Sequence, residues 1–164
     1  TVTQAEFTRD RPNKEPLRWH VPVIAETVGG TPVRALVDGQ ASMKLPGCGP
    51  ALVNVGQSGY YRTLYAPAQL AALKQDFAKL APIDKLGMMD DAWAEGMAGL
   101  QPVSDFLDMA KATPADAKPE IWAEVAGSLA GLDNYYRGDK VRQNRFRAYA
   151  IKQLAPVFAR GPAK

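Results

Sequence analysis

The sequence contains one cysteine and one histidine, so two common kinds of functional centre have little to build on. Cys48 alone cannot form an internal disulfide. A catalytic zinc ion needs three protein ligands and an open position for water, often the two histidines of an H-E-x-x-H helix turn plus a carboxylate. The only histidine, His20, stands between Trp19 and Val21 in a strand-like run. We therefore expect no metal site in this chain and a packed or surface position for His20.

Motifs for nucleotide binding and nucleophilic catalysis are missing as well. The chain has no Walker lysine loop and no G-x-G-x-x-G turn, so nothing indicates a nucleotide site. Residues 56–59 resemble part of a nucleophile elbow, but Tyr60 occupies the place of the second glycine in G-x-S-x-G. A reactive thiol at Cys48 has no support, since this residue lies in a turn rich in Gly and Pro. We predict no catalytic residue and no cofactor-binding residue.

Long apolar runs are also absent, because Gly, Pro or a charge interrupts each one well short of the ~20 residues that a membrane span needs. We expect no transmembrane helix. Apolar residues make up 46% of the chain and charged residues 23%, which is typical of a globular domain. The net charge of +3 does not by itself indicate a nucleic-acid partner. The sequence leaves the cellular compartment open.

Residues 1–66 are predicted to form a small antiparallel β-sandwich domain. Short segments rich in Val, Thr, Leu and aromatic residues alternate with Gly, Pro, Asp and Asn, which favour turns. Several short strands in so few residues are typical of a sandwich. The predicted strands are 2–7, 17–28, 33–36, 42–45, 51–55 and 60–65.

Residues 67–164 are predicted to form a domain of antiparallel α-helices. Apolar residues recur every three or four positions, which is the spacing of one helix face. Short connections make neighbouring helices antiparallel, and helix pairs of this size stack as α-solenoids in HEAT and armadillo proteins. The predicted inward-facing residues are Leu70, Leu73, Phe77 and Leu80; Leu86, Met89, Trp93, Met97 and Leu100; Phe106, Leu107 and Ala110; Ile121, Val125, Leu129 and Leu132; and Phe146, Tyr149, Ala150, Leu154 and Phe158.

Two groups of charged residues have both a functional and an ordinary interpretation. Asp90, Asp91 and Glu95 form a group of carboxylates, and the spacing of four puts Asp91 and Glu95 on one helix face. Acid–base chemistry would need a cleft that shifts their pKa values apart. A solvated face opposite Met89 and Trp93 is the favoured interpretation. The basic residues within 137–152 are interleaved with aromatic residues, as in some nucleic-acid interfaces. At helical spacing they form the exposed side of a terminal helix, and we expect no nucleic-acid partner.

Two stretches of the strand half carry family signatures. Gln4 and Phe7, followed by residues 19–23 (WHVPV), are similar to a Q-x-x-F pattern followed by W-x-[IV]-P-[VL]. Asn54, followed by residues 59–65 (GYYRTLY), is similar to N-x-x-x-x-G-Y-Y-R-V-x-Y, which is the more specific of the two. In this order they resemble the aminopeptidase N family of gluzincin zinc aminopeptidases, in the part of the chain that follows the catalytic domain.

A third stretch extends the resemblance into the helical half. Residues 84–93 resemble the family's D-R-x-x-L-x-D-D-x-F segment, with Lys85 in place of Arg and Trp93 in place of Phe. We expect structural roles for the signature at 59–65. Gly59 would occupy a turn where a side chain cannot fit, and Tyr60, Tyr61 and Tyr65 would alternate on the two faces of a strand.

The resemblance implies that the intact protein removes N-terminal residues from peptides with a zinc-bound water. The family's zinc ligands and catalytic glutamate belong to an upstream domain, so we expect this segment to be inactive alone. It would brace the catalytic domain, its partner in the same polypeptide, and begin the helical bowl over the peptide substrate. The family's helical domain has more helices, so we expect the chain to continue in a longer protein. The alternative is a stand-alone helical protein–protein interaction module.

Overall fold

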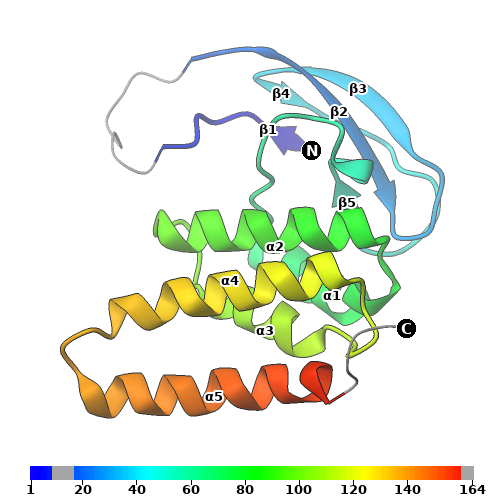
Figure 1. The fold of residues 1–164 in the computed structure, drawn as a ribbon. Helices are drawn as coiled ribbons and strands as arrows, with labels where there is room; N and C mark the ends of the chain where they lie inside the picture. Colours follow the sequence, from blue (N-terminus) through cyan, green and yellow to red (C-terminus); the bar gives the residue numbers. More distant parts are fainter. Residues whose placement is uncertain (9–16, 160–164) are drawn as a thin grey trace.

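The computed structural model describes residues 1–8 and 17–159, and in these residues two small antiparallel sheets precede five α-helices (Figure 1). The larger sheet has the order β3-β2-β5, formed by β2 (His20–Thr27), β3 (Val33–Asp38) and β5 (Ala51–Val53). The smaller sheet pairs β1 (Val2–Thr3) with β4 (Gln40–Ala41). The predicted combination of antiparallel strands followed by helices is confirmed.

The larger sheet is half-buried, and its side chains alternate accordingly. Val23, Ala25 and Val37 are buried. Pro22 of β2 lies directly opposite Leu36 of β3, and both are exposed. Since successive side chains of a strand point to opposite faces, one face of β2 and β3 carries the buried residues and the other face carries Pro22 and Leu36.

Two of the predicted strands were wrong. Residues 42–45 pair with no strand, and the carbonyl of Pro46 just beyond them accepts a hydrogen bond from the Thr27 hydroxyl. Residues 60–65 form an irregular segment, in which the backbone N–H of Thr63 donates to Asp91 of a helix, α2 (Pro82–Met97), and not to a neighbouring strand. Tyr60 is fully exposed, so the predicted alternation of the tyrosines across a strand was wrong too.

Besides α2, the helices are α1 (Pro67–Asp76), α3 (Ser104–Ala112), α4 (Pro119–Tyr135) and α5 (Lys140–Phe158). Three of these five helices begin with proline, which is favoured there because the first helical N–H has no partner inside the helix. Figure 1 shows α4 and α5 side by side, and the two helices are in contact. None of the described helices combines the length and the hydropathy needed to cross a membrane.

The core lies among α1 to α4 and extends to the larger sheet through Leu52 of β5. Most of the predicted inward-facing residues are buried or partly buried in it. Leu100 and Phe158 were predicted to face inward but are 51% and 79% exposed. Their prediction was wrong because α2 ends before Leu100, and Phe158 lies at the last position of α5. The fully buried large side chains of the helical part are Leu73, Phe77, Met89, Phe106, Met109, Ile121 and Val125.

Candidate functional site

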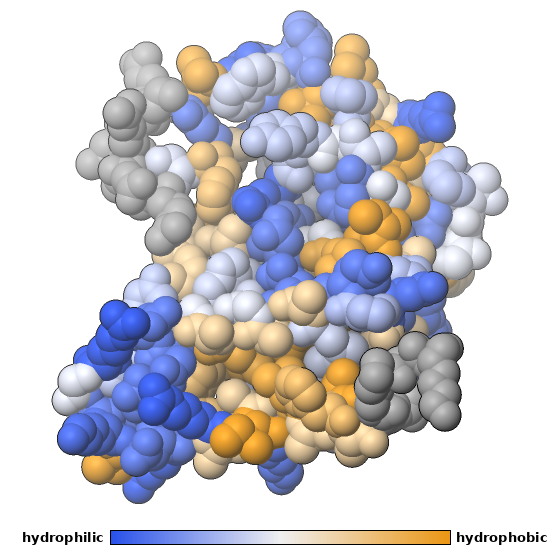
Figure 2. Space-filling model, in the orientation of Figure 1, coloured by the Kyte–Doolittle hydropathy of each residue, from blue (hydrophilic) through white to orange (hydrophobic). Residues whose placement is uncertain are grey.

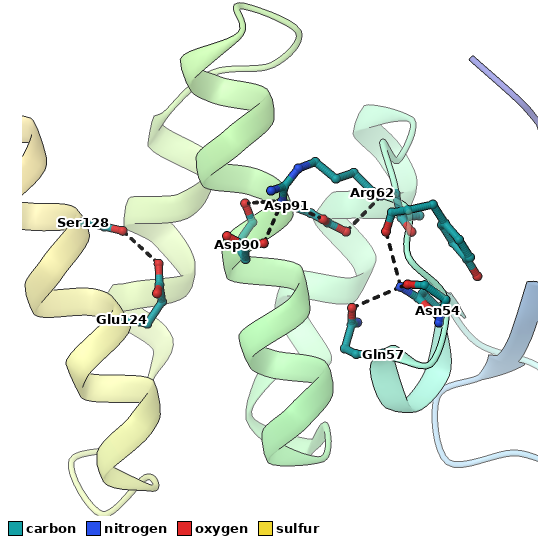
Figure 3. Close-up of polar contacts among 10 residues, drawn as sticks. Asn54, Gln57, Arg62, Asp90, Asp91, Glu124 and Ser128 are labelled. Atoms are coloured by element: carbon teal, nitrogen blue, oxygen red, sulfur yellow. Dashed lines mark hydrogen bonds and ion pairs between the residues drawn. The ribbon is translucent and has the colours of Figure 1, made fainter. Parts of the chain in front are cut away.

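The second and third sequence signatures meet at one place, which we call the junction: residues 54–65 together with the side of α2 that faces them (Figure 3). The backbone N–H of Gly56 donates to Asp84 Oδ1 at 2.7 Å, and the N–H of Thr63 donates to Asp91 Oδ2 at 2.9 Å. Each bond joins residues that are 28 positions apart in the chain. The junction therefore attaches the end of the strand part to the helical part.

Asn54 organises the turn at the start of the junction. Its side chain is buried, with 1% of the residue exposed, and its backbone has a left-handed φ of 62°, which Asn tolerates better than most residues. Asn54 Nδ2 donates to the Gly59 carbonyl at 3.0 Å and to Gln57 Oε1 at 3.1 Å, and Oδ1 accepts from the Gly59 N–H at 2.9 Å. One amide thus holds both ends of the turn.

Two glycines allow the close packing of this turn. A Cβ atom on Gly59 would lie 2.1 Å from the ring of Tyr61, which confirms the prediction that no side chain fits there. A Cβ atom on Gly87 of α2 would lie 1.9 Å from the amide carbon of Gln57. The side chain of Gln57 therefore rests on α2 where the helix has no side chain of its own.

The side of α2 that faces residues 54–65 is polar and buried. Asp84, Met88, Asp91 and Glu95 follow one another at spacings of four, three and four, so they form one stripe on the helix. Asp84, Asp91 and Glu95 are only 4%, 7% and 2% exposed. The predicted solvated face at Asp91 and Glu95 was therefore wrong. The regular spacing of the three carboxylates was the signal, but it does not distinguish a buried stripe from an exposed one.

Burial changes the acidity of these side chains. It raises the pKa of Asp91 to about 6, although the N–H of Thr63 and the Arg62 guanidinium favour the charged form. Burial, and next the negative charge of Asp91, raise the pKa of Glu95 to about 7. Burial also raises the pKa of Asp84, against the hydrogen bond from Gly56. Two carboxyl groups one helix turn apart thus titrate near neutrality.

Arg62 adds ion pairs between the facing segment and α2. Its Nη1 lies 2.8 Å from Asp90 Oδ2 and 3.3 Å from Asp91 Oδ1 (Figure 3). On its other side the guanidinium lies 5.3 Å from the centre of the Phe7 ring, a cation–π distance. Because Phe7 belongs to the first signature and Asp90 to the third, Arg62 connects all three.

The junction connects the strand part to the helical part and offers no room for a substrate. The cavity at the junction measures about 10 Å³ and holds no more than about one water molecule. Among residues 1–8 and 17–159, no group of three or more His, Cys, Asp or Glu side chains is placed to hold a metal ion. His20 is exposed on β2 with Nε2 3.5 Å from Asp38 Oδ2, and Cys48 is exposed.

The basic residues considered for nucleic-acid binding lie on α5 and in the turn before it, and two of them form ion pairs within the chain. Arg147 Nη2 lies 2.8 Å from Asp133 Oδ2, and Arg142 Nε lies 3.3 Å from Asp139 Oδ2. Two of these cations are therefore paired with carboxylates of the same chain.

Several known proteins are similar in sequence to this chain. Tricorn protease-interacting factor F2 of Thermoplasma acidophilum is 28% identical over 154 residues, which cover 94% of this chain and 18% of that protein. Puromycin-sensitive aminopeptidase of Caenorhabditis elegans is 26% identical over 144 residues, covering 80% of this chain and 15% of that protein. Glutamyl aminopeptidase of Bitis rhinoceros is 27% identical over 109 residues, covering 64% and 11%. The chain thus spans less than a fifth of each of these relatives.

The family predicted from the three signatures is confirmed by these aminopeptidase relatives and by a match to a family of domains. The match covers residues 51–162, which include the junction and the five α-helices. This chain belongs to the family of ERAP1-like C-terminal domains.

Proposed function

We propose that this chain is a non-catalytic C-terminal segment of a zinc-dependent aminopeptidase that removes N-terminal residues from peptides. The match of residues 51–162 to an aminopeptidase C-terminal domain family carries the proposal. Zinc and its ligands would lie in an upstream catalytic domain of the same polypeptide. The segment would not hydrolyse peptides alone.

In this proposal the two parts of the chain have different tasks. Residues 1–66 are a β-sandwich domain that braces the catalytic domain, and residues 67–164 are the first helices of an α-solenoid-like domain that encloses the substrate cavity. The junction supports this division of tasks, because Asn54, Arg62 and the α2 carboxylates fix the strand part to the first helices. If the strand part supports the catalytic domain, its connection to the first helices must be rigid.

Exposed apolar side chains of the strand part support a covering domain there. Leu17 is 51% exposed, Trp19 44% and Leu36 63%. Burying a large apolar side chain stabilises a contact by about 1.5–3 kcal/mol, so residues of this kind are suited to an interface.

On the helical part, Figure 2 shows hydrophobic residues reaching the surface along α4 and α5, and hydrophilic residues gathered at the end where these two helices are joined. On this face of the helical part, polar and apolar regions are thus separated.

The decisive experiment measures the size and the activity of the native protein in its source cells. An antibody raised against this chain should detect, on a denaturing gel, a band several-fold heavier than 17.7 kDa. The immunoprecipitate should cleave an aminoacyl p-nitroanilide and lose that activity with a zinc chelator, whereas the purified 164-residue chain should not cleave it. A native band near 17.7 kDa would refute the proposal and favour a stand-alone helical interaction module.

A further inference from the structure

The outer side of α5 carries large apolar side chains that no part of residues 1–8 or 17–159 covers. α5 lies at the edge of the helical part, beside α4 (Figure 1). On its inner side, Phe146 and Leu154 pack against the core. On its outer side, Val141 is 64% exposed, Ile151 68% and Phe158 79%. The helix is therefore apolar on two sides, and only one of them has a neighbour among the described residues.

The exposed apolar residues belong to one narrow row, which we call the α5 stripe. Its six members are all exposed and alternate at spacings of three and four: Val141, Asn144, Ala148, Ile151, Ala155 and Phe158. This spacing repeats every seven residues, which is the seam along which one helix packs against another. The side chains of Ala148 and Ala155 are small enough for a second helix to approach closely. The spacing therefore indicates a helix as the partner of the stripe.

Basic side chains flank the α5 stripe on both sides. α5 contains five basic residues and no acidic one. Lys140 and Arg147 stand along one edge of the stripe, and Arg145 and Lys152 along the other. In heptad packing, the charges at these flanking positions meet the charges of the partner helix. Arg147 is paired with Asp133, whereas Arg145 and Lys152 form no ion pair with another residue of 1–8 or 17–159.

These charges distinguish between the possible partners of the α5 stripe. A second copy of this chain is disfavoured, because two α5 helices packed along their stripes would bring basic edges together. Anionic membranes attract basic amphipathic helices, but such helices insert a face of bulky apolar residues. The α5 stripe has two alanines and one asparagine among its six positions. A helix with Asp or Glu along its own flanks would place carboxylates opposite Arg145 and Lys152, and it fits both the spacing and the charge.

We propose that the α5 stripe docks against an acidic amphipathic helix of the same polypeptide, which follows residue 164 in the longer protein. That helix carries apolar residues at heptad spacing and Asp or Glu on both sides of them. The source rests on the proposed function, in which this chain is one segment of an aminopeptidase. The relatives have room for it, since this chain spans less than a fifth of each. Consecutive helices joined by a short connection pack as antiparallel neighbours, which places the next helix beside α5.

Two designed peptides of about three heptads each test the docking surface on the 164-residue chain. Both peptides have leucine at the stripe positions. The glutamate probe has Glu at the flanking positions, and the lysine probe has Lys there. Fluorescence anisotropy should show that the chain binds the glutamate probe roughly tenfold or more tightly than the lysine probe, because flanking charges attract in one complex and repel in the other. Added salt should reduce this preference.

Substitutions on α5 separate the contributions of charge and of apolar contact. The double substitution Arg145→Glu and Lys152→Glu should reverse the preference, so that the lysine probe binds more tightly, a gain that loss of folding cannot produce. Ile151→Asp should weaken binding of the glutamate probe about tenfold or more, because it removes a large apolar side chain from the centre of the stripe. Ile83→Asp, at an exposed isoleucine of α2, is the matched control and should leave the binding unchanged. Circular dichroism verifies that each variant is folded.

Equal affinity for the two probes would overturn the docking surface, and so would unchanged binding by Ile151→Asp. A dimer in sedimentation that Ile151→Asp dissociates would assign the stripe to a second copy of the chain and overturn the acidic partner. Binding to phosphatidylserine vesicles without binding to the glutamate probe would assign it to a membrane, with the same consequence.

The source of the helix is tested in the full-length protein. In a Cys48→Ser background, which removes the exposed native thiol, a maleimide should label Ile151→Cys readily in the 164-residue chain. It should label the full-length protein at least about tenfold more slowly with no other protein added, as measured by mass spectrometry of the peptide that contains residue 151. Equal rates would overturn the intramolecular source. A native band near 17.7 kDa would refute the proposed function, whereas the two probes test the docking surface whatever the length of the native protein.

Discussion

Replacing Asn54 by alanine should destabilise the whole chain, because one side chain holds the turn at the junction. The substitution removes three hydrogen bonds of 3.1 Å or less, two to Gly59 and one to Gln57. Each contributes about 1 kcal/mol, and the cost is larger where a buried partner is left without a replacement. Alanine in the left-handed conformation of Asn54 adds about 1 kcal/mol of strain. The expected loss is about 3–5 kcal/mol.

Urea unfolding followed by far-ultraviolet circular dichroism measures this loss. Asn54→Gly removes the same hydrogen bonds without the backbone strain, so its loss should be about 1 kcal/mol smaller than that of Asn54→Ala. The control is Asn144→Ala at an exposed position of α5, where the change should stay within about 0.5 kcal/mol. A loss below about 1 kcal/mol for Asn54→Ala would refute the assigned role of the amide.

Three further substitutions test the core, the junction and the brace. Phe106→Ala removes a fully buried ring that meets Trp93 at a centroid distance of 5.5 Å, and should cost about 3–5 kcal/mol in the same urea assay; a loss near zero would contradict its core position. Gly87→Ala should cost about 1–3 kcal/mol through overlap with Gln57, and adding Gln57→Ala should recover part of it, whereas simple additivity would refute the overlap. Leu36→Asp should leave the free energy of unfolding of this chain within about 0.5 kcal/mol of the original. In the proposed full-length aminopeptidase it should speed thermal inactivation, and equal inactivation rates would count against a covered Leu36.

The helices of this chain could be predicted from local periodicity because their apolar stripes are unambiguous. Leu70, Leu73, Phe77 and Leu80 are all buried, as their spacing indicated. Phe77 and Leu80 are buried as predicted, although α1 ends at Asp76 and a 3-10 helix begins at Phe77. A helix with one apolar face needs only a neighbour of the same kind to bury it.

The junction could not be predicted because its polar groups satisfy one another over a long sequence distance. Residues 60–65 have the aromatic composition of a strand, but the N–H of Thr63 finds its acceptor on a helix. Asp91 and Glu95 have the composition of a solvated face, but the facing segment covers them. Composition describes a residue's own preference, whereas burial depends on which distant segment packs against it.

The bonds across the junction close overlapping loops of the chain, and because they share residues 63–84 the bonds are cooperative. Gly56 bonds to Asp84, Arg62 to Asp90 and Thr63 to Asp91, each across 28 positions, so all three loops contain α1. Closing a flexible loop of that length costs about 3 kcal/mol of chain entropy. The first bond to form carries this entropic cost, and the other two then form without it. The loop should therefore close and open as a unit.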